Sequence, residues 1–486
     1  MVQARIGSQL SGRVTSYLSG SNGRSELLVF GFIAVYATAM SYFAVLKHNA
    51  FLSYWFDLGI YAQEFWLKMQ GAPSILFEHR PILFGLLPVY SLFPRPETLL
   101  VIQSVILGLA ALPLYWFARD ELKSPLAGVV FAGALLLYPP LHGVNTFDFH
   151  VEAFLVPFFM FALYYLHRGR WYRYFLFTGL LLLTMVEASL LVGAMGLYAL
   201  WIYRQRWISF RRESSLTISL SWTLQPRIAL ATLLMAGIAY GIAWFSGAAP
   251  ALLNSLIPPA VVGPLLSDLA TKLTYVVQVF GPLGFLAFLS PMPLLMAVPW
   301  WGYSFTSSFP EMISIYFQYG AFVTPFVFFA GVLGAKNLAL PGGTIGIASA
   351  RRGLVLIVVT SLLFFQWLSP LAQPWPIMDT RRQTIHQIIV LIPKESSVLT
   401  QNDLYPHLTG RFRLYGSIST SDITEYILVD TRSYWFQAWP PSEPIAVMLQ
   451  RLLQGARYGV LAEFDGIYLY QLGYEGSPIV MDEISR

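Results

Sequence analysis

Long runs of residues without a charge constrain this chain more than any other feature. Residues 27–46 and 99–117 are each uncharged and mostly apolar over about twenty positions. An α-helix needs about this length to cross a hydrocarbon layer about 30 Å thick. The backbone of such a helix can lie in the hydrocarbon layer, because its amide and carbonyl groups form hydrogen bonds with one another. The sequence therefore predicts a polytopic α-helical membrane protein.

About eleven hydrophobic helices are predicted in the first three quarters of the chain. Only 11% of the residues are charged, against about 25% in soluble proteins, which excludes an ordinary water-facing surface. A single helix over 174–203, with Glu187 at its centre, is an alternative that would break the charge rule for loops. We therefore expect two short helices there, with Glu187 at a recessed tip between them. The predicted helices cover 27–46, 97–118, 124–140, 151–167, 174–186, 188–203, 228–246, 272–290, 291–305, 320–338 and 354–369.

Lys and Arg residues are divided unequally between alternate loops. With the N-terminus inside, sixteen of them fall in cytoplasmic segments and five in the external loops before residue 370. Positive loops tend to stay in the cytoplasm. We therefore expect a multi-pass protein of the cell membrane, with a cytoplasmic tail at 1–26 and an external C-terminus. The net charge of +5 then reflects topology, and we expect no nucleic-acid partner.

Two segments outside the predicted helices have their own organisation. Within the transmembrane domain at 27–369, the external loop 47–96 is predicted to carry surface helices at 53–70 and 82–93, rich in interfacial aromatic residues. The composition changes after 369, and residues 370–486 are predicted to form an external soluble α/β domain. Its elements are helices at 378–392 and 443–453, strands at 397–400, 412–415 and 426–430, and a hairpin of 458–463 with 466–471.

Acidic side chains gather in the predicted external loops. Asp57 lies between bulky apolar residues, where exposure to lipid would be costly; a solvated helix face is the alternative reading. Asp148, His150 and Glu152 point the same way if their segment is extended, whereas Asp148 and Glu152 share a face if it is helical. Either geometry suits a divalent metal such as Mg²⁺ or Mn²⁺. A helix cap by Asp148 would explain the same pattern.

Three further residues are candidates for substrate binding. His79 and Arg80 precede the second surface helix, and an Arg at this place suits the phosphate of a lipid carrier. Glu187 would need a partner if it is buried. The C-terminal domain adds a polar cluster, which either forms turns and caps or binds a ligand: Gln401, Asn402, Asp403, His407 and Arg411.

Four motifs resemble those of a known prokaryotic family. They are FDLGIYAQ at 56–63, EHRPILFGLLPVYSLFPRPETLLVIQS at 78–104, LLYPPL with FDFHVEAF within 136–154, and IPKESSVLTQNDLYPHLTGR at 392–411. Over nearly its whole length the chain resembles the predicted membrane proteins of domain of unknown function 2079 (DUF2079). More remotely, it is similar to the C-type (GT-C) glycosyltransferases.

The resemblance to GT-C enzymes implies a fold and a chemistry. Those enzymes use sugars linked to polyprenyl phosphate at the external membrane face. By this resemblance, Asp57 matches the first-loop acid that serves as catalytic base or metal ligand, and Asp148 matches the second-loop acid. The segment 186–188, Val-Glu-Ala, departs from the Lys-Glu-Asp triplet expected in the DUF2079 family and keeps only the Glu.

Two classes of function follow as hypotheses. In the first, a sugar moves from a polyprenyl-phosphate donor to an external acceptor, with Asp57 as the base. Asp148, His150 and Glu152 would hold the metal at the donor phosphate, and Arg80 would offset further phosphate charge. The alternative is a non-catalytic membrane subunit or lipid-binding scaffold with the same fold. A transporter ranks third, because it would ordinarily show inverted repeats. Membrane lipids are expected partners in every case.

Overall fold

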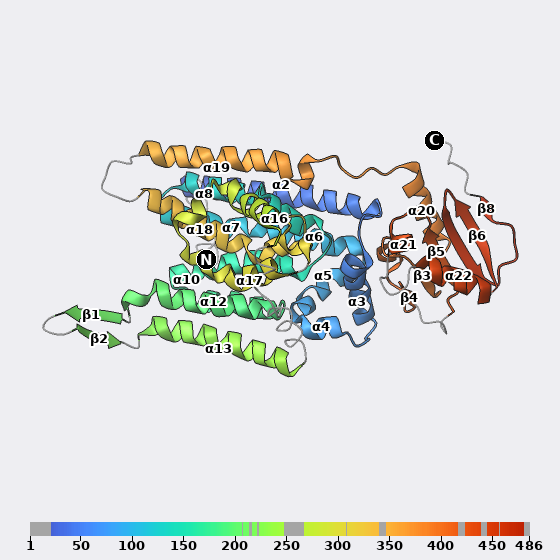
Figure 1. Cartoon of the computed structure of the whole chain (residues 1–486), viewed down its shortest axis with the longest axis horizontal. Helices are drawn as coiled ribbons and strands as arrows, with labels where there is room; N and C mark the ends of the chain where they lie inside the picture. Colours follow the sequence, from blue (N-terminus) through green and yellow to red (C-terminus); the bar gives the residue numbers. More distant parts are fainter. Residues whose placement is uncertain are drawn as a thin grey trace, which may run out of the picture.

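A helical bundle and a smaller sheet domain at one of its ends make up the chain (Figure 1). The computed structural model describes residues 21–206, 208–212, 216–220, 223–246, 267–307, 309–339, 347–416, 423–438, 445–455 and 457–480. Residues 1–20 of the predicted N-terminal tail lie outside the described part. The first described helix, α2 (Ser21–Asn49), begins six residues earlier than the predicted helix at 27–46.

The helix α2 packs against two other helices of the bundle along part of its surface. It lies against α6 (Pro96–Leu109) and α8 (Pro125–Leu136). Glycine makes these close approaches possible, because a Cβ atom at Gly108 would lie 3.2 Å from the ring of Tyr36. After α6 the chain continues into α7 (Ala111–Leu122), so that Pro96–Leu122 forms one apolar span.

Fewer helices are long enough to span a membrane than the sequence predicts. In the described part of the chain three qualify by length and composition: α2, Pro96–Leu122 and α13 (Leu224–Phe245). A fourth results if α8 and α9 (Pro139–Thr146), bent by 46°, count as one span. The predicted number of about eleven is therefore not confirmed, although the predicted segments are largely helical.

Proline and glycine account for much of this difference. The segment predicted as one helix at 272–290 consists of α16 (Leu269–Phe280) followed by 3₁₀ turns at Gly281–Leu283 and Leu286–Leu289. Pro282 lacks the amide hydrogen that would continue an α-helix. The other helices of the bundle are α10 (Leu155–Arg168), α11 (Trp171–Leu182), α12 (Glu187–Ile202), α17 (Val298–Thr306), α18 (Thr324–Ala339) and α19 (Ile347–Leu368).

The segment around Glu187 forms two helices, as predicted. His167 near the end of α10 and Tyr198 near the end of α12 form a hydrogen bond of 3.0 Å between Nε2 and the phenol oxygen. The chain therefore returns to the same end of the bundle through α11 and α12, which excludes a single long helix. Glu187 begins α12 at the opposite end. An unpredicted antiparallel hairpin, β1 (Ile208–Arg212) with β2 (Leu216–Leu220), follows α12.

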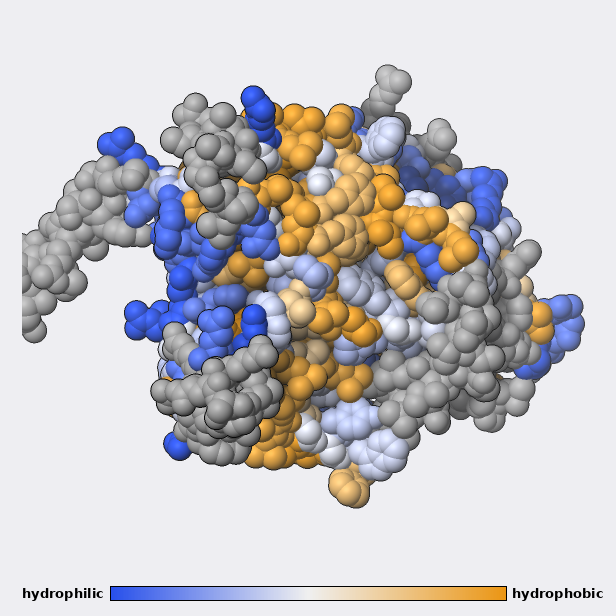
Figure 2. Space-filling view, turned by 60° about the vertical axis from the view of Figure 1, so that its left-hand side comes forward, coloured by the Kyte–Doolittle hydropathy of each residue, from blue (hydrophilic) through white to orange (hydrophobic). Residues whose placement is uncertain are grey.

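The surface of the bundle supports a membrane location. Figure 2 shows a broad hydrophobic band across the visible face, with hydrophilic residues at its margins. Large exposed apolar side chains lie on α2, α13 and α19, among them Val35, Ile242 and Leu363. Apolar surface of this extent is stable against lipid and unfavourable in water.

The loop after α2 folds into short helices at the end of the bundle next to the sheet domain (Figure 1). The two predicted surface helices correspond to the π-helical turn η1 (Trp55–Gly59) with α3 (Ile60–Met69), and to the 3₁₀ turn η2 (Pro81–Gly85) with α5 (Leu87–Leu92). The helix α4 (Ile75–His79) lies between them in the sequence. Buried side chains such as Phe65 and Phe77 give this region an apolar core of its own.

The sheet domain contains the elements predicted from its sequence pattern. Six strands lie in the order β4-β3-β5-β7-β6-β8. The pairs β3–β4, β3–β5 and β6–β8 are parallel, and the other two are antiparallel. The strands are β3 (Val398–Thr400), β4 (Leu414–Tyr415), β5 (Tyr426–Asp430), β6 (Tyr458–Phe464), β7 (Ile467–Leu472) and β8 (Ile479–Val480).

A helix packs against each face of this sheet. Ile388 of α20 (Thr380–Val390) contacts one apolar cluster, and Leu449 of α22 (Ile445–Gly455) contacts the other. Phe51, from the loop after α2, belongs to the α20 cluster. The membrane part of the chain therefore contributes to the core of the sheet domain.

The predicted orientation can be tested with cysteine labelling, because the chain has no cysteine. Gln205 and Glu475 are both exposed; Gln205 lies just before β1 and Glu475 lies between β7 and β8, and β1 and β8 are at opposite ends of the molecule (Figure 1). We expect a membrane-impermeant maleimide added to sealed cells to label the Glu475→Cys variant and not the Gln205→Cys variant. Both should react once the membrane is permeabilised. The reverse pattern in sealed cells would show that the predicted orientation is wrong.

Candidate functional site

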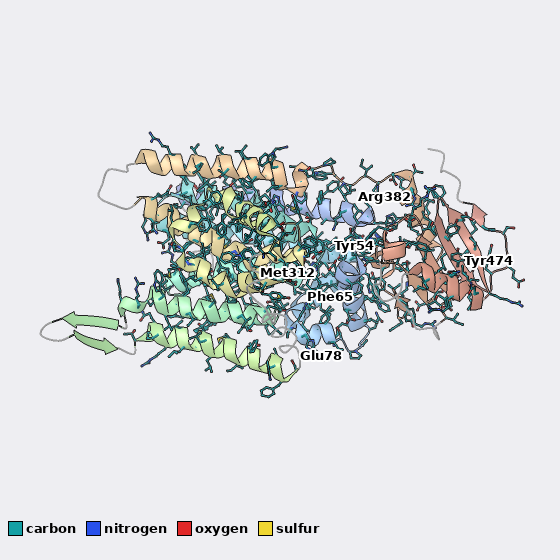
Figure 3. The ribbon with its side chains drawn as sticks, viewed as in Figure 1. Tyr54, Phe65, Glu78, Met312, Arg382 and Tyr474 are labelled. Atoms are coloured by element: carbon teal, nitrogen blue, oxygen red, sulfur yellow. The ribbon has the colours of Figure 1, made fainter. Side chains whose placement is uncertain are left out.

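Asp57 and His150 form an ion pair where η1 meets the loop after α9. The Nε2 atom of His150 lies 2.9 Å from Oδ1 of Asp57, and the two side chains are 7% and 19% exposed. The neighbouring residue Tyr54 marks this region in Figure 3, between the helical bundle and the sheet domain. Two predicted site residues that are far apart in the sequence are thus in direct contact.

Asp148 is held at the start of η1 by different partners. Its Oδ1 accepts a hydrogen bond of 2.9 Å from Lys47 Nζ, and its Oδ2 accepts one of 2.8 Å from the backbone amide of Tyr54. Burial raises the pKa of Asp148 to about 6, although the positive charge of Lys47 acts in the opposite direction. Both carboxylate oxygens of Asp148 are therefore occupied by protein.

A buried amide, Gln103 on α6, fixes the backbone of this loop. Its Nε2 donates to the carbonyl oxygen of Asp148 over 2.7 Å, and its Oε1 accepts from the backbone amide of His150 over 2.8 Å. Asp148 has a φ of 86°, a left-handed conformation that residues with a side chain rarely adopt. Such a conformation persists where several contacts enforce it. Gln103 is the only amide side chain in the uncharged run 99–117, and this isolation was the one feature of the sequence that could have indicated its role.

Negative charge surrounds the imidazole of His150. Burial opposes protonation of His150, but the carboxylates of Asp57, Glu152 and Asp148 outweigh it, so the pKa of His150 is raised. The raised pKa favours the protonated ring, whose positive charge pairs with the carboxylate of Asp57. The Nδ1 atom of His150 and the Oε2 atom of Glu152 are buried and have no hydrogen-bond partner among the described residues.

The three predicted metal ligands fit a metal ion only in part. His150 Nδ1 and Glu152 Oε2 are buried without a hydrogen-bond partner among the described residues, whereas Asp148 is bound to Lys47 and Tyr54. Across the described ranges, no group of three or more His, Asp or Glu side chains is arranged to hold a metal ion. The residues present do not form a three-ligand site, and Mg²⁺ or Mn²⁺ as a cofactor stays a prediction.

Arg80 and Glu187 approach the same site from other loops. Arg80 donates a hydrogen bond to the hydroxyl of Tyr61, whose ring meets His150 edge-on at 6.3 Å between centroids. The carboxylate of Glu187 interacts electrostatically with Glu152 and Arg80. His79 lies exposed at the end of α4 and makes no hydrogen bond to this group within the described part of the chain.

A narrow apolar crevice lies beside Glu187, with about 10 Å³ of free volume. Glu187 is the one charged residue among the described residues that line it. The apolar walls come from α12, from α17 and from the 3₁₀ turn at Gln318–Phe322. They are Leu190, Leu191, Pro299, Trp300, Tyr303 and Phe322.

The sheet domain holds the segment that carries Asp57. The side chain of Asn402 accepts a hydrogen bond of 2.7 Å from the backbone amide of Trp55, two residues before Asp57. Farther along, Gln63 Nε2 donates to the carbonyl oxygen of Arg411 over 2.6 Å. Two members of the predicted polar cluster, Asn402 and Arg411, therefore hold η1 and α3 in place. The roles of Gln63 and Lys47 were not predicted from the sequence.

Comparisons with known proteins agree with this architecture. A family model described as "Predicted membrane protein (DUF2079)" matches residues 47–469. Comparison with curated proteins gives no sequence match. Among solved structures, the crystal structure of ArnT from Cupriavidus metallidurans in the apo state matches with a TM-score of 0.57 at 12% identity, covering 91% of this chain and 97% of ArnT. ArnT is a GT-C glycosyltransferase. At this identity the match shows a shared fold.

We expect Gln103→Leu to lower the stability of the protein. The substitution leaves the carbonyl of Asp148 and the amide of His150 buried without partners, and each such group costs about 1–3 kcal/mol. The midpoint of thermal unfolding of the purified protein measures the effect. Gln373→Leu, at an exposed position, is the matched control and should change stability by at most about 0.5 kcal/mol. Equal midpoints for the two variants would show that Gln103 does not hold the loop.

The raised pKa of His150 predicts a pH-dependent contribution to stability. A base whose pKa is raised by folding stabilises the folded state below its ordinary pKa of about 6.5. This contribution is lost as the pH rises through the higher folded pKa. Thermal unfolding between pH 5.5 and 8.5 should therefore show that the stability gap between the native protein and His150→Gln narrows as the pH rises. A gap independent of pH would contradict the ion pair with Asp57.

Proposed function

This chain belongs to the DUF2079 family of predicted membrane proteins, and we propose that it transfers a sugar from a polyprenyl-phosphate donor to an acceptor outside the cell. The observation that carries the proposal is the Asp57–His150 pair, placed beside Arg80 and Glu187 in a GT-C fold. A carboxylate oriented by an imidazole and open to solvent on one side suits the activation of a hydroxyl group.

Asp57 is proposed to act as the general base. Its Oδ1 is bound to His150, while its Oδ2 accepts no hydrogen bond from the residues that the structure describes. In the reaction, the acceptor oxygen forms a bond to the anomeric carbon and its proton passes to Asp57. The bond from that carbon to the phosphate oxygen breaks, and polyprenyl phosphate leaves with the electron pair. His150 acts as a positioning residue that orients Asp57.

Arg80 and the crevice at Glu187 are proposed to bind the donor. The guanidinium of Arg80 suits the phosphate, and Tyr61 connects it to the His150 ring. The apolar walls at Leu190 and Trp300 suit the first part of a polyprenyl chain. The crevice is narrow, so its side chains would move apart to admit the chain. The predicted metal at Asp148, His150 and Glu152 is not needed for any step described here.

A non-catalytic scaffold is the second candidate. Two observations favour it: Lys47 and Tyr54 occupy both carboxylate oxygens of Asp148, and the segment 186–188 lacks two of the three polar residues expected in the family. In this reading the ion pairs hold the loops together, and the crevice binds a membrane lipid without turnover.

Replacing Asp57 by Asn separates the two functions. The Asn side chain keeps the shape but loses the charge, and general-base catalysis contributes about 10²–10⁴-fold. We expect the variant to fold and to lose transfer by this factor, measured with purified protein in liposomes and a panel of polyprenyl-phosphate sugars.

The matched control is Asp268→Asn, at an exposed position with a left-handed backbone that Asn tolerates. It should transfer sugar at the native rate. Near-native transfer by Asp57→Asn would remove Asp57 from the mechanism. No transfer by the native protein with any donor of the panel would favour the scaffold.

A further inference from the structure

A second cleft lies where the bundle meets the sheet domain. Its volume is about 300 Å³, far above the 10–15 Å³ that one water molecule needs. The end of α2, the turn before α6, α20 and the 3₁₀ turn at Tyr405–Leu408 all contribute to its walls. None of the residues placed above in the proposed transfer lines it. Its polar lining includes His48, Asn49, Arg95, Glu97, His386 and His407.

Three imidazole rings stand together in this cleft. His48 and His407 stack with 4.1 Å between ring centroids, and His386 meets His407 edge-on at 5.2 Å. Protein contacts fix two of the rings: His48 Nδ1 lies 2.6 Å from Ser53 Oγ, and His386 Nε2 lies 2.8 Å from the carbonyl oxygen of Asn49. The Nε2 atom of His407 is buried and has no partner among the described residues.

Burial keeps the ring of His407 neutral. It lowers the pKa of His407 well below the usual value, and the neighbouring His48 and His386 act in the same direction. A neutral imidazole offers one hydrogen-bond donor and one acceptor. Arg95 adds donors, Glu97 adds acceptors, and the amide of Asn49 supplies both. The lining therefore mixes donors and acceptors within one space.

The mixture of hydrogen-bond donors and acceptors favours a sugar over a phosphate or a metal ion as the ligand. A sugar hydroxyl both donates and accepts hydrogen bonds, so each can meet either kind of lining group. A phosphate only accepts, and it would face the carboxylate of Glu97 with one cation, Arg95, among the described lining residues. Three histidines also suit a metal, but no group within the described ranges has that arrangement.

We propose that this cleft binds a saccharide. It would hold units of the acceptor away from the reacting hydroxyl, and in this respect the inference rests on the proposed function. Two segments connect the cleft to the Asp57 site. Lys47, which pairs with Asp148, directly precedes His48, and Pro406 of the cleft follows Tyr405, which packs on Gly59. A chain of sugar units bound in the cleft would therefore lie beside the segment that carries Asp57.

Binding can be measured without turnover. The probes are neutral mono- and oligosaccharides of hexose, N-acetylhexosamine and pentose, detected by saturation-transfer NMR with the purified full chain in nanodiscs. We expect at least one to bind with a Kd on the order of 1 mM. Arg95→Gln and Glu97→Gln should each weaken it about tenfold, because each replaces a charge-assisted hydrogen bond to the sugar by a weaker neutral one. Glu395→Gln, an exposed carboxylate outside the cleft, should bind as the native chain does.

Two further variants make the test decisive. Thr409→Tyr places a large side chain in the cleft and should abolish binding, whereas Asp268→Asn, at an exposed position outside the cleft, should leave binding unchanged. The proposal is overturned if no saccharide of the panel binds, or if Thr409→Tyr binds as well as the native chain. It is equally overturned if inorganic phosphate or Zn²⁺ binds in place of the saccharides and the cleft variants weaken that binding. Saccharide binding without sugar transfer would refute the proposed function alone.

Discussion

The buried ion pair of Lys47 and Asp148 is the interaction on which the site depends. Lys47 lies in the last turn of α2, Asp148 lies on the loop after α9, and the second oxygen of Asp148 accepts a hydrogen bond from the amide of Tyr54 at the start of η1. Three segments are thus joined at one carboxylate. Removing one partner of such a pair typically costs 3–5 kcal/mol, because the other charge is left buried. This constraint fixes where η1 begins and therefore where Asp57 lies.

The sheet domain takes part in the same arrangement. Asn402 holds the amide of Trp55, and the ring of Trp55 stacks on Tyr405 at 5.1 Å between centroids. Phe51 reaches the other way, into the apolar cluster beneath α20. Residues of the sheet domain contact the loop after α2, and a residue of that loop packs in the core of the sheet domain. The position of Asp57 therefore depends on both the bundle and the sheet domain. The saccharide cleft that we propose lies along this boundary for the same reason.

The bundle itself combines long apolar helices with broken ones. Breaks at Gly281-Pro282 and between α8 and α9 leave backbone groups without helical partners. Such groups are tolerated at membrane depth where protein or a polar cavity satisfies them. The carbonyl oxygen of Val279, near the end of α16, is one such backbone group. It accepts a hydrogen bond from the hydroxyl of Tyr138. The broken helices are thus shorter than continuous transmembrane helices, and some of their backbone groups form hydrogen bonds with other parts of the protein.

The sequence by itself determined the membrane class, the two helices around Glu187, the surface helices after α2 and most elements of the sheet. These follow from local rules, namely apolar length, the distribution of positive charge and the periods of helix and strand. It also predicted that Asp57, Asp148 and His150 lie in loops on one side of the membrane, but it did not predict their partners. Only the tertiary structure decided that Asp57 pairs with His150, that Lys47 and Tyr54 occupy Asp148, and that Gln103 holds their loop. Those contacts join residues roughly fifty to a hundred positions apart, and side-chain periodicity carries no information about such distant pairs.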